Sequence, residues 1–256
     1  MRSSEKKSLF RNCVPVIAVF LIFLTASCSK KNNSGSGTTN PGTANIAFVN
    51  ASPTTSSYNI YSGSTNLTPA GGIAYGSVSG ASGGSPYLGL VPGTDSIRVS
   101  ANGTTYVVDT AVNISNNGYY TLFVYDTVNS SGHLKALLLN DPSTLPTSGQ
   151  AEVRFINLSS NSAPLFVSLI NGTDTIHDNN LTYVGSGLLS ADSLSAFMSI
   201  NPGTYTVAVQ NNEGTRIADT SSFSFAANSV YTLYAKGYQN GLNGTDSLSV
   251  GIIKNY

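Results

Sequence analysis

The residues best suited to catalysis are two aspartates of the stretch "DTIHDNN", Asp174 and Asp178, which stand four positions apart. Glycosidases act through paired carboxylates, so this pair is the local candidate for hydrolysis of a polysaccharide. The same stretch offers Asp174, Asp178 and Asn179 as oxygen ligands for calcium, although their spacing matches no known calcium loop. His133 and His177 belong to no catalytic motif, and the sequence has no HExxH, GxSxG, CxxC or phosphate-binding loop. We therefore predict a protein that is not an enzyme and that needs no metal and no cofactor.

Tyrosine is the aromatic residue to consider for ligand binding, because the chain has 14 tyrosines and no tryptophan. Aromatic faces can stack on sugar rings. Most tyrosines stand at alternating positions of predicted strands, where cross-strand packing accounts for them. Four others flank the glycine-rich residues 69–84, which we expect to form a long surface loop. These four, Tyr58, Tyr61, Tyr75 and Tyr87, are the candidate ligand contacts.

The N-terminus predicts export and lipidation. Basic residues precede an apolar run at residues 14–26, as in a secretory signal, and a run of about 13 residues is too short for a permanent membrane helix. Thr25, Ala26 and Ser27 lead into Cys28, an arrangement that resembles the lipobox of bacterial lipoproteins. The resemblance implies that residues 1–27 are removed and that Cys28 is acylated. Lipidation also explains why an exported chain keeps one cysteine, which has no partner for a disulfide.

The residues that follow Cys28 predict a tether and a destination. Residues 28–43 are rich in Ser, Asn, Gly and Thr and lack the apolar side chains of a core, which is typical of a flexible linker. Ser29 stands where some inner-membrane lipoproteins have aspartate, which favours the outer membrane. Lys30 and Lys31 replace the acidic patch that directs some lipoproteins to the cell surface, so both the periplasmic face and the cell surface stay open.

A short pattern recurs after aspartate. Seven of the nine aspartates precede Ser or Thr, and six of those triplets end in a small or aliphatic residue. The pattern is similar to the Asp-Ser/Thr-aliphatic acceptor of general O-glycosylation in some Gram-negative bacteria. A turn aspartate that enters a β-branched strand gives the same three letters, so both interpretations stand. The candidate acceptors are Ser96, Thr110, Thr127, Thr175, Ser193 and Ser247.

Composition predicts an all-β protein that does not bind nucleic acid. Four of the 12 basic residues and one of the 12 acidic residues lie in the leader, so the mature chain has a net charge of −3. Without a basic patch, the main source of affinity for phosphate backbones is missing. Glutamate is scarce, while Gly, Asn, Ser and Thr are abundant, so the strong helix formers needed to cover helix surfaces are lacking.

The chain contains two copies of one unit. The block "ANIAFVNAS" returns as "AEVRFINLS", "VPGTDSIRV" as "NPGTYTVAV", and "GYYTLFVYD" as "SVYTLYAKG", at offsets of about 110 residues. Alternating apolar residues and Gly, Pro and Asn turns predict about seven short strands in each unit, which is typical of an immunoglobulin-like antiparallel β-sandwich. In the first unit these strands cover residues 45–50, 57–61, 96–100, 104–110, 119–126 and 134–139. We expect two tandem sandwich domains at residues 44–141 and 151–256, joined by a linker at residues 142–150.

The repeated blocks resemble the domain-of-unknown-function family 4397, in which an Ala-Ser-Pro strand opening, a Pro-x-Gly-Thr turn and a Tyr-Thr strand recur. In this chain they read "FVNASP", "VPGTDSIRV" and "YYTLFVYD", and the second unit has "NLSSNSAP" in place of Ala-Ser-Pro. The resemblance covers both units and implies a fold, but it brings no catalytic residues.

Three functions fit the sequence. The leading hypothesis is a non-enzymatic outer-membrane lipoprotein that serves as a binding, adhesion or envelope-scaffold module and that has a glycan or an envelope protein as partner. An alternative is an accessory or catalytic component of polysaccharide degradation, which would need paired carboxylates at glycosidase distances. A third is pairing of an exposed edge strand with a partner.

Overall fold

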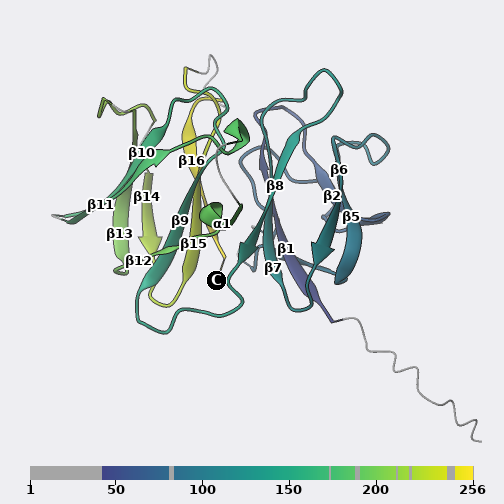
Figure 1. Cartoon of the computed structure of the whole chain (residues 1–256), viewed down its shortest axis with the longest axis horizontal. Helices are drawn as coiled ribbons and strands as arrows, with labels where there is room; N and C mark the ends of the chain where they lie inside the picture. The colour runs from purple at the N-terminus through teal and green to yellow at the C-terminus, as the bar shows by residue number, and fades with distance from the viewer. Residues whose placement is uncertain are drawn as a thin grey trace, which may run out of the picture. The chain divides into compact units, whose positions relative to one another are not determined.

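The chain folds into 16 β-strands arranged in four sheets, within the residues that the structure describes (Figure 1). The structure is a computed structural model, and it describes residues 42–80, 84–172, 174–187, 191–211, 213–218, 221–240 and 246–255. These residues belong to one compact unit. Cys28, the predicted lipidation site, and nearly all of the predicted tether lie outside the described residues.

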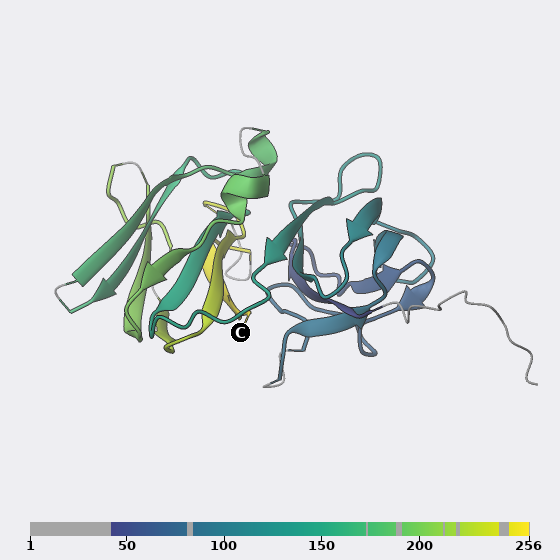
Figure 2. The same cartoon turned by 60° about the horizontal axis from the view of Figure 1, so that its bottom comes forward.

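The first sandwich, coloured from purple to teal in Figures 1 and 2, has two four-stranded sheets. One sheet has the strand order β4-β1-β7-β8 and the other has the order β3-β2-β5-β6. Its strands are β1 (Ala44–Ala51), β2 (Asn59–Ser62), β3 (Thr65–Asn66), β4 (Tyr87–Leu90), β5 (Gly93–Ser100), β6 (Val108–Ile114), β7 (Tyr119–Tyr125) and β8 (Lys135–Asp141).

The second sandwich repeats this order strand by strand, as β12-β9-β15-β16 and β11-β10-β13-β14. Its strands are β9 (Ala151–Asn157), β10 (Leu165–Asn171), β11 (Asp174–Leu181), β12 (Met198–Ile200), β13 (Gly203–Gln210), β14 (Ser221–Phe225), β15 (Val230–Lys236) and β16 (Ser249–Lys254). A 3-10 turn, η1 (Val184–Ser186), and the short helix α1 (Ala191–Leu194) lie between β11 and β12. No helix in the described part of the chain is long and apolar enough to span a bilayer.

The predicted fold class, all-β with two tandem sandwiches, is confirmed. The structure adds one feature that the strand pattern does not contain: the central strands β1 and β7 pair in parallel, as do β9 and β15, while the other neighbours are antiparallel. The strand order therefore differs from the ABED and CFG sheets of immunoglobulin constant domains.

The strand predicted at residues 104–110 is displaced to β6, Val108–Ile114. The backbone N–H groups of Thr104 and Thr105 donate to the side-chain oxygen of Asn102, at 3.0 and 2.9 Å, and the N–H of Gly103 donates to Ser100 Oγ at 2.9 Å. These local bonds fold the start of the predicted strand into a turn, as Asn and Ser side chains commonly do.

Alternation of side chains builds a core inside each sandwich. In β13, Tyr205, Val207 and Val209 point inward and are at most 2% exposed, whereas Thr204 and Thr206 lie on the outer face. This is the period of two expected for a strand with one buried face. The turn before it needs glycine: Gly203 has φ 154°, and Gly93, its counterpart in the first sandwich, has φ 128°.

The repeated Asn-x-Ser of "FVNAS" and "FINLS" has a structural role. The buried Asn50 amide donates to the carbonyls of Ser56 and Ile73 at 3.1 and 3.0 Å, while its oxygen accepts the N–H of Ser52 at 3.2 Å. Asn157 repeats this pattern, since its amide donates to the Leu181 carbonyl at 3.0 Å and its oxygen accepts the N–H of Ser159 at 3.0 Å. Each asparagine thus satisfies backbone groups where the first strand of its sandwich ends.

A third hydrophobic cluster joins the two sandwiches. It takes side chains from β1, β7 and β8 of the first sandwich and from β9, β15 and β16 of the second, and Leu194 of α1 adds to it. Across this cluster the rings of Phe123 and Tyr234 meet edge to face, with centroids 5.4 Å apart. Its buried members are Val49, Ala51, Phe123, Tyr125, Leu139, Ile156, Leu158, Leu194, Tyr234 and Ile253.

Beside this cluster lies a buried ion pair between Arg154 of β9 and Asp141 of β8, whose side chains are 1% and 0% exposed. Arg154 also donates from Nε to Thr232 Oγ1 and from Nη1 to the Asn140 carbonyl, both at 2.9 Å. Burial lowers the pKa of Arg154, and the charge of Asp141 opposes that shift. The guanidinium therefore keeps a partner for each of its donor nitrogens inside the fold.

The Asp141 carboxylate is satisfied from several sides. Besides Arg154 it accepts from Thr121 Oγ1 at 2.6 Å, from the Tyr87 hydroxyl at 2.8 Å and from the Asn255 amide at 3.2 Å. A buried charge is tolerated when it is both paired and hydrogen-bonded, and this network provides both.

We expect Arg154→Met to lower the free energy of unfolding by about 3–5 kcal/mol, because it leaves the Asp141 charge buried without a cation. Urea unfolding measures the change. The double variant Arg154→Met, Asp141→Leu should recover much of the loss, since it removes both charges.

The matched control is Lys135→Met, which breaks the ion pair of Lys135 Nζ and Asp126 Oδ2 at 3.0 Å. Lys135 is 48% exposed, so this loss should stay below about 1 kcal/mol. Equal effects of the two single substitutions would refute the role assigned to the buried pair.

Candidate functional site

A cleft of about 280 Å³ opens on the second sandwich between β11 and β12, the edge strands of its two sheets. Strands β9, β11 and β12 and helix α1 contribute to its walls. Figure 1 shows α1 beside β9. The lining side chains fall into a polar group, Asp178, Asn180, Thr182 and Ser193, and an apolar group that includes Leu181, Leu194, Phe197 and Met198.

A β-bulge in β11 shapes the polar wall. Leu165 of β10 pairs with Leu181 and Val167 pairs with Asp178, so β11 has two residues where β10 has one. Asn180, the second of these, has φ 65°, a left-handed conformation that asparagine tolerates better than most residues. Bulges are frequent beside functional sites because they redirect side chains and end strand pairing.

Asp178 gives the cleft its charge. It is half-buried, and within the described residues no hydrogen bond or ion pair involves its carboxylate. Burial raises the pKa of the Asp178 carboxyl above its usual value, because the charged form loses solvation without gaining a partner. A carboxyl group with a perturbed pKa in a cleft is a recognised sign of a binding or active site.

Arg154 also lines the cleft and packs against the apolar wall. Its guanidinium carbon lies 4.7 Å from the centroid of the Phe197 ring, and its charge is compensated by Asp141. Beside Phe197, Met198 and Leu194 complete an apolar surface that faces the polar groups of β11. One wall can therefore pack against carbon and the other can form hydrogen bonds, which is the usual composition of a small-molecule site.

Of the two aspartates that the sequence offered for hydrolysis, Asp178 lines the cleft, and the backbone places Asp174 well away from it along β11. Asp174 and Asp178 lie on the same strand four residues apart, so their Cα atoms are about 13 Å apart. The carboxyl groups of glycosidases are about 5–9.5 Å apart. Among the described residues, no group of three His, Cys, Asp or Glu side chains could hold a metal ion. His177 is exposed, and its Nδ1 forms a hydrogen bond of 2.9 Å with Ser168 Oγ.

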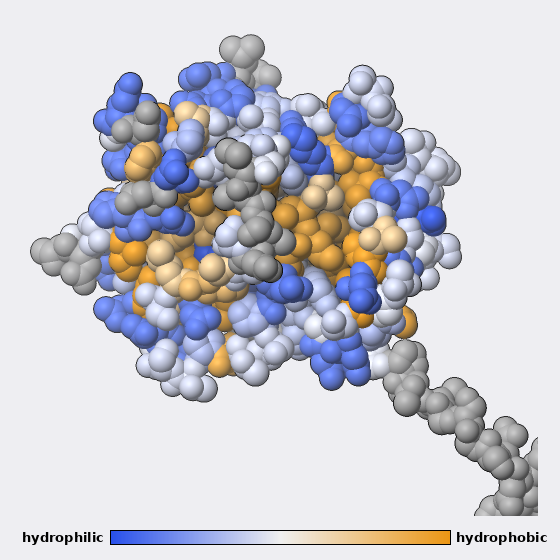
Figure 3. Space-filling model, viewed as in Figure 1, coloured by the Kyte–Doolittle hydropathy of each residue, from blue (hydrophilic) through white to orange (hydrophobic). Residues whose placement is uncertain are grey.

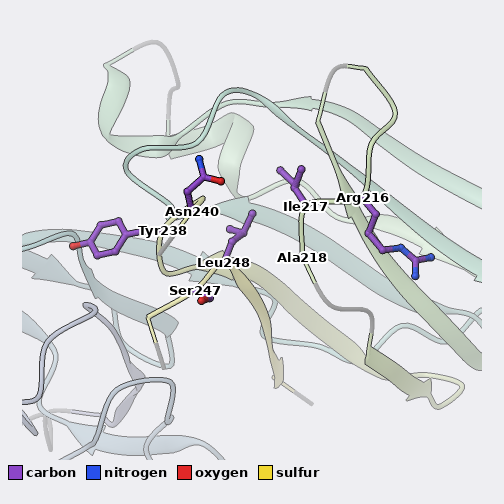
Figure 4. A pocket seen from close by; sticks show the side chains of 7 residues that line it. All are labelled: Arg216, Ile217, Ala218, Tyr238, Asn240, Ser247 and Leu248. Atoms are coloured by element: carbon purple, nitrogen blue, oxygen red, sulfur yellow. The ribbon is translucent and has the colours of Figure 1, made fainter. Parts of the chain in front are cut away.

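A larger pocket, of about 420 Å³, lies on the other side of the second sandwich. Figure 4 shows the side chains of Arg216 and Tyr238 at its two ends, pointing away from each other, with Ile217 and Leu248 between them. Its polar groups therefore do not converge on one point.

In the first sandwich, hydrophobic surface is visible where β6 and β8 lie in Figure 3, and core residues such as Leu122 line an opening there.

The four tyrosines predicted as ligand contacts are not gathered into one site. Tyr58 is 2% exposed in the first core, and Tyr87 donates to buried Asp141. Tyr75 lies under Lys236, whose Nζ is 4.6 Å from the ring centroid, and burial raises the pKa of Tyr75 to about 12. Tyr61 remains at the surface, edge to face with Tyr106 at 6.0 Å. None of the four lines the cleft between β11 and β12.

The predicted acceptor residues are mostly at the surface. Thr110, Thr127, Thr175 and Ser193 are exposed, whereas Ser96 and Ser247 are half-buried. Ser96 Oγ donates to Asp109 Oδ1 at 2.5 Å, so its hydroxyl is engaged within the sheet. Thr110, Thr127, Thr175 and Ser193 therefore meet the requirement of exposure for glycosylation.

Two residues singled out from the sequence line the cleft, Asp178 and the candidate acceptor Ser193, whereas Asn180, Thr182, Phe197 and Met198 were not predicted. The available signal was the polar stretch "DTIHDNN" followed at a distance by "AFM". Residues 181–195 separate the two, and the pairing of β11 and β12 with different sheets brings them to one opening.

Residues 44–168 match the family described as "Domain of unknown function (DUF4397)". The match covers the first sandwich and continues through β9 into β10. It confirms the predicted resemblance for the first unit. No curated protein matches the chain.

Two solved structures are similar in outline. The crystal structure of CBMbc (family CBM26) from Eubacterium rectale Amy13K, in complex with maltoheptaose, has 12% identity and a TM-score of 0.27, covering 84% of this chain and 97% of that one. A leucine-rich repeat protein from Bacteroides thetaiotaomicron has 14% identity and a TM-score of 0.20, covering 75% of this chain and 25% of that one. Likeness at these TM-scores carries no functional argument.

We expect Asp178→Asn to stabilise the protein at neutral pH. Because the folded state raises the pKa of Asp178, ionisation opposes folding, and an amide of the same shape avoids that cost. The gain in the free energy of unfolding should be at most about 1 kcal/mol, since water screens a half-buried group. It should be complete above the folded-state pKa and should vanish as the pH falls below the unfolded-state value of about 3.9, where Asp178 becomes neutral in both states.

Urea unfolding at a series of pH values measures this difference. Asp109→Asn is the control of opposite sign, because the Ser96 hydroxyl and Arg98 lower the pKa of the exposed Asp109. That substitution should destabilise the protein at neutral pH. A loss of stability in Asp178→Asn at neutral pH would mean that Asp178 serves the fold and not a ligand.

Proposed function

We propose that this protein is a non-enzymatic binding module of the cell envelope that holds a saccharide in the cleft between β11 and β12. The observation that carries the proposal is that a half-buried carboxylate with no partner among the described residues and an apolar, aromatic surface line one cleft. A sugar presents both surfaces that such a cleft requires: hydroxyl groups at its rim and C–H groups on its ring faces.

The polar wall fits the hydroxyl groups. The Asp178 carboxylate can only accept hydrogen bonds when ionised, so its counterpart must be a donor such as a hydroxyl. The Asn180 amide can donate and accept at once, and the Thr182 hydroxyl can do the same. Asn180 is exposed, so a ligand can reach it.

The apolar wall fits the ring face. Phe197 and Met198 line the cleft together, and the guanidinium of Arg154 packs against Phe197. A rigid aromatic ring supplies contact area without loss of conformational freedom on binding, which favours affinity for a small ligand. Among the described lining residues Asp178 is the one carboxylate, and the other side chains of this lining suit binding.

The export signal, the lipobox-like Cys28 and the polar tether support a place in the outer membrane, on the periplasmic face or the cell surface. There the two sandwiches would serve binding or adhesion, with the second sandwich as a further copy of the domain matched by the first. The same cleft would also suit an accessory component of polysaccharide degradation, as a module that holds a glycan for another protein.

Saccharide binding is tested with the substitution Asn180→Gly. Glycine accepts the left-handed backbone conformation of this position, so the change removes the amide and leaves the bulge intact. We expect at least about a tenfold weaker affinity for glycans that the wild-type protein retains on an array, because a bound sugar hydroxyl loses its partner. Isothermal titration calorimetry with those glycans gives the value.

Asn240→Gly is the matched control. Asn240 is also exposed and has φ 70°, but it lines the other pocket of the second sandwich. Its replacement should leave glycan affinity unchanged. Loss of binding in Asn240→Gly with full binding in Asn180→Gly would move the site to the other pocket, and a wild-type protein that retains no glycan would refute the proposal.

Lipid anchoring is tested by the intact mass of the protein extracted from membranes. We expect a chain that starts at Cys28 and carries acyl groups. Cys28→Ser should abolish the acyl mass, whereas Cys13→Ser should leave the mature mass unchanged, because Cys13 lies in the removed leader. An unmodified Cys28 in the wild-type protein would refute the anchor. Extra mass at hexose intervals would identify glycosylation of the Asp-Ser/Thr sites.

A further inference from the structure

We infer that the ligand of this cleft carries an ammonium group, so that the saccharide it selects is an amino sugar with a free amine. The inference rests on the proposed function and narrows it to one substrate class. Its basis is the charge of Asp178, which has no cation partner among the described residues. Asp109, Asp126 and Asp141 each have one.

Three other aspartates each have a cation within the fold. Asp141 pairs with Arg154, Asp126 with Lys135 at 3.0 Å, and Asp109 with Arg98 at 3.0 Å. The Asp109 and Asp126 pairs are partly exposed, where a partner contributes little, yet the partner is present. Asp178 lies half-buried in a concave site and has no cation among the described residues.

The charges that line the cleft do not balance. Among the side chains that the structure describes, they are those of Arg154 and Asp178, and the guanidinium of Arg154 already contacts Asp141 from a position that is 1% exposed. The cleft therefore presents one uncompensated negative charge at the pH where Asp178 is ionised. Burial of that charge destabilises the ionised form, as the raised pKa of Asp178 reflects.

An ammonium group on the ligand would neutralise the charge of Asp178 most directly. A neutral hydroxyl gives the carboxylate one ordinary hydrogen bond, whereas an ammonium gives a charge-assisted bond, which is roughly twice as strong. It also restores electrical neutrality to a partly desolvated site. Binding of the cation would favour the ionised form of Asp178 and return its pKa toward the usual range.

The apolar wall is compatible with a cation. The Phe197 ring already has the guanidinium of Arg154 at 4.7 Å, and aromatic faces attract cations through their quadrupole. The polarisable thioether of Met198 adds to this surface. The volume of about 280 Å³ is near the lower end for ligand pockets, which fits one sugar unit more closely than an extended chain.

Calorimetric titration of the mature protein with glucosamine, glucose and N-acetylglucosamine tests the inference, at a pH where the amine is protonated and Asp178 is ionised. We expect glucosamine to bind at least about tenfold more tightly than glucose, and N-acetylglucosamine to lose this gain because acetylation removes the charge. Asp178→Asn should bring glucosamine to the affinity of glucose. Asp109→Asn, at a paired and exposed aspartate, should leave all three affinities unchanged.

The outcomes separate this inference from the function on which it rests. Equal binding of glucose and glucosamine overturns the amine requirement and leaves saccharide binding in place. Failure of all three sugars, together with an empty glycan array, overturns saccharide binding itself. A fourth titrant, Nα-acetyl-lysine amide, carries the ammonium without the sugar. If it binds as tightly as glucosamine in an Asp178-dependent manner, the site recognises a peptide amine and the amino-sugar assignment is wrong.

Discussion

The contact between Arg154 and Asp141 is the constraint on which the rest of this structure depends. Both groups are almost completely buried, and each would be unfavourable there without the other. Because Asp141 ends β8 and Arg154 lies in β9, the pair holds the last strand of the first sandwich against the first strand of the second. The hydrogen bonds from Thr121, Tyr87 and Asn255 draw β7, β4 and the C-terminal segment to the same carboxylate. A directional network of this kind favours one packing of two sheets that apolar contacts alone would specify less sharply.

The same arginine connects this interface to the cleft. Its guanidinium supports Phe197, which forms part of the apolar wall, while Asp178 stands on the edge strand β11. The charge of Arg154 is thereby compensated within the fold, whereas the charge of Asp178 has no cation among the described residues. Under the proposed function, this unpaired carboxylate would lower stability in favour of binding, which is a common relation between stability and function.

Much of the fold could be predicted from the sequence because its determinants are local. The alternation of polar and apolar residues in "TYTVAV" predicts a strand with one buried face. The Pro-Gly-Thr turns need glycine at Gly93 and Gly203. The repeated blocks indicate two copies of one domain. The parallel pairing of β1 with β7 could not be predicted, since it depends on contacts between residues about 70 positions apart. The cleft could not be predicted for the same reason. Asn180 takes its conformation from a one-residue bulge, and Phe197 directly precedes β12, a strand of the other sheet. Tyr58 and Tyr87 were predicted as ligand contacts because the sequence does not distinguish a tyrosine that packs in a core from one that binds a ligand.

The cleft lies in the second sandwich, where the connection between β11 and β12 differs from the corresponding connection between β3 and β4 of the first. In the first sandwich, the segment from β3 to β4 lies over the corresponding side: Ile73 enters the core and bridges to Tyr58, and Ser79 binds the backbone of Phe48 and Pro86. In the second, β11 is longer than β3, and the segment that leads to β12 contributes walls in place of a filling. The shared asparagines Asn50 and Asn157 keep the same backbone frame in both copies, so the connection can change without cost to the sheets. The first copy is thus filled at this place, whereas the second keeps an opening there, lined by residues such as Asn180 and Phe197.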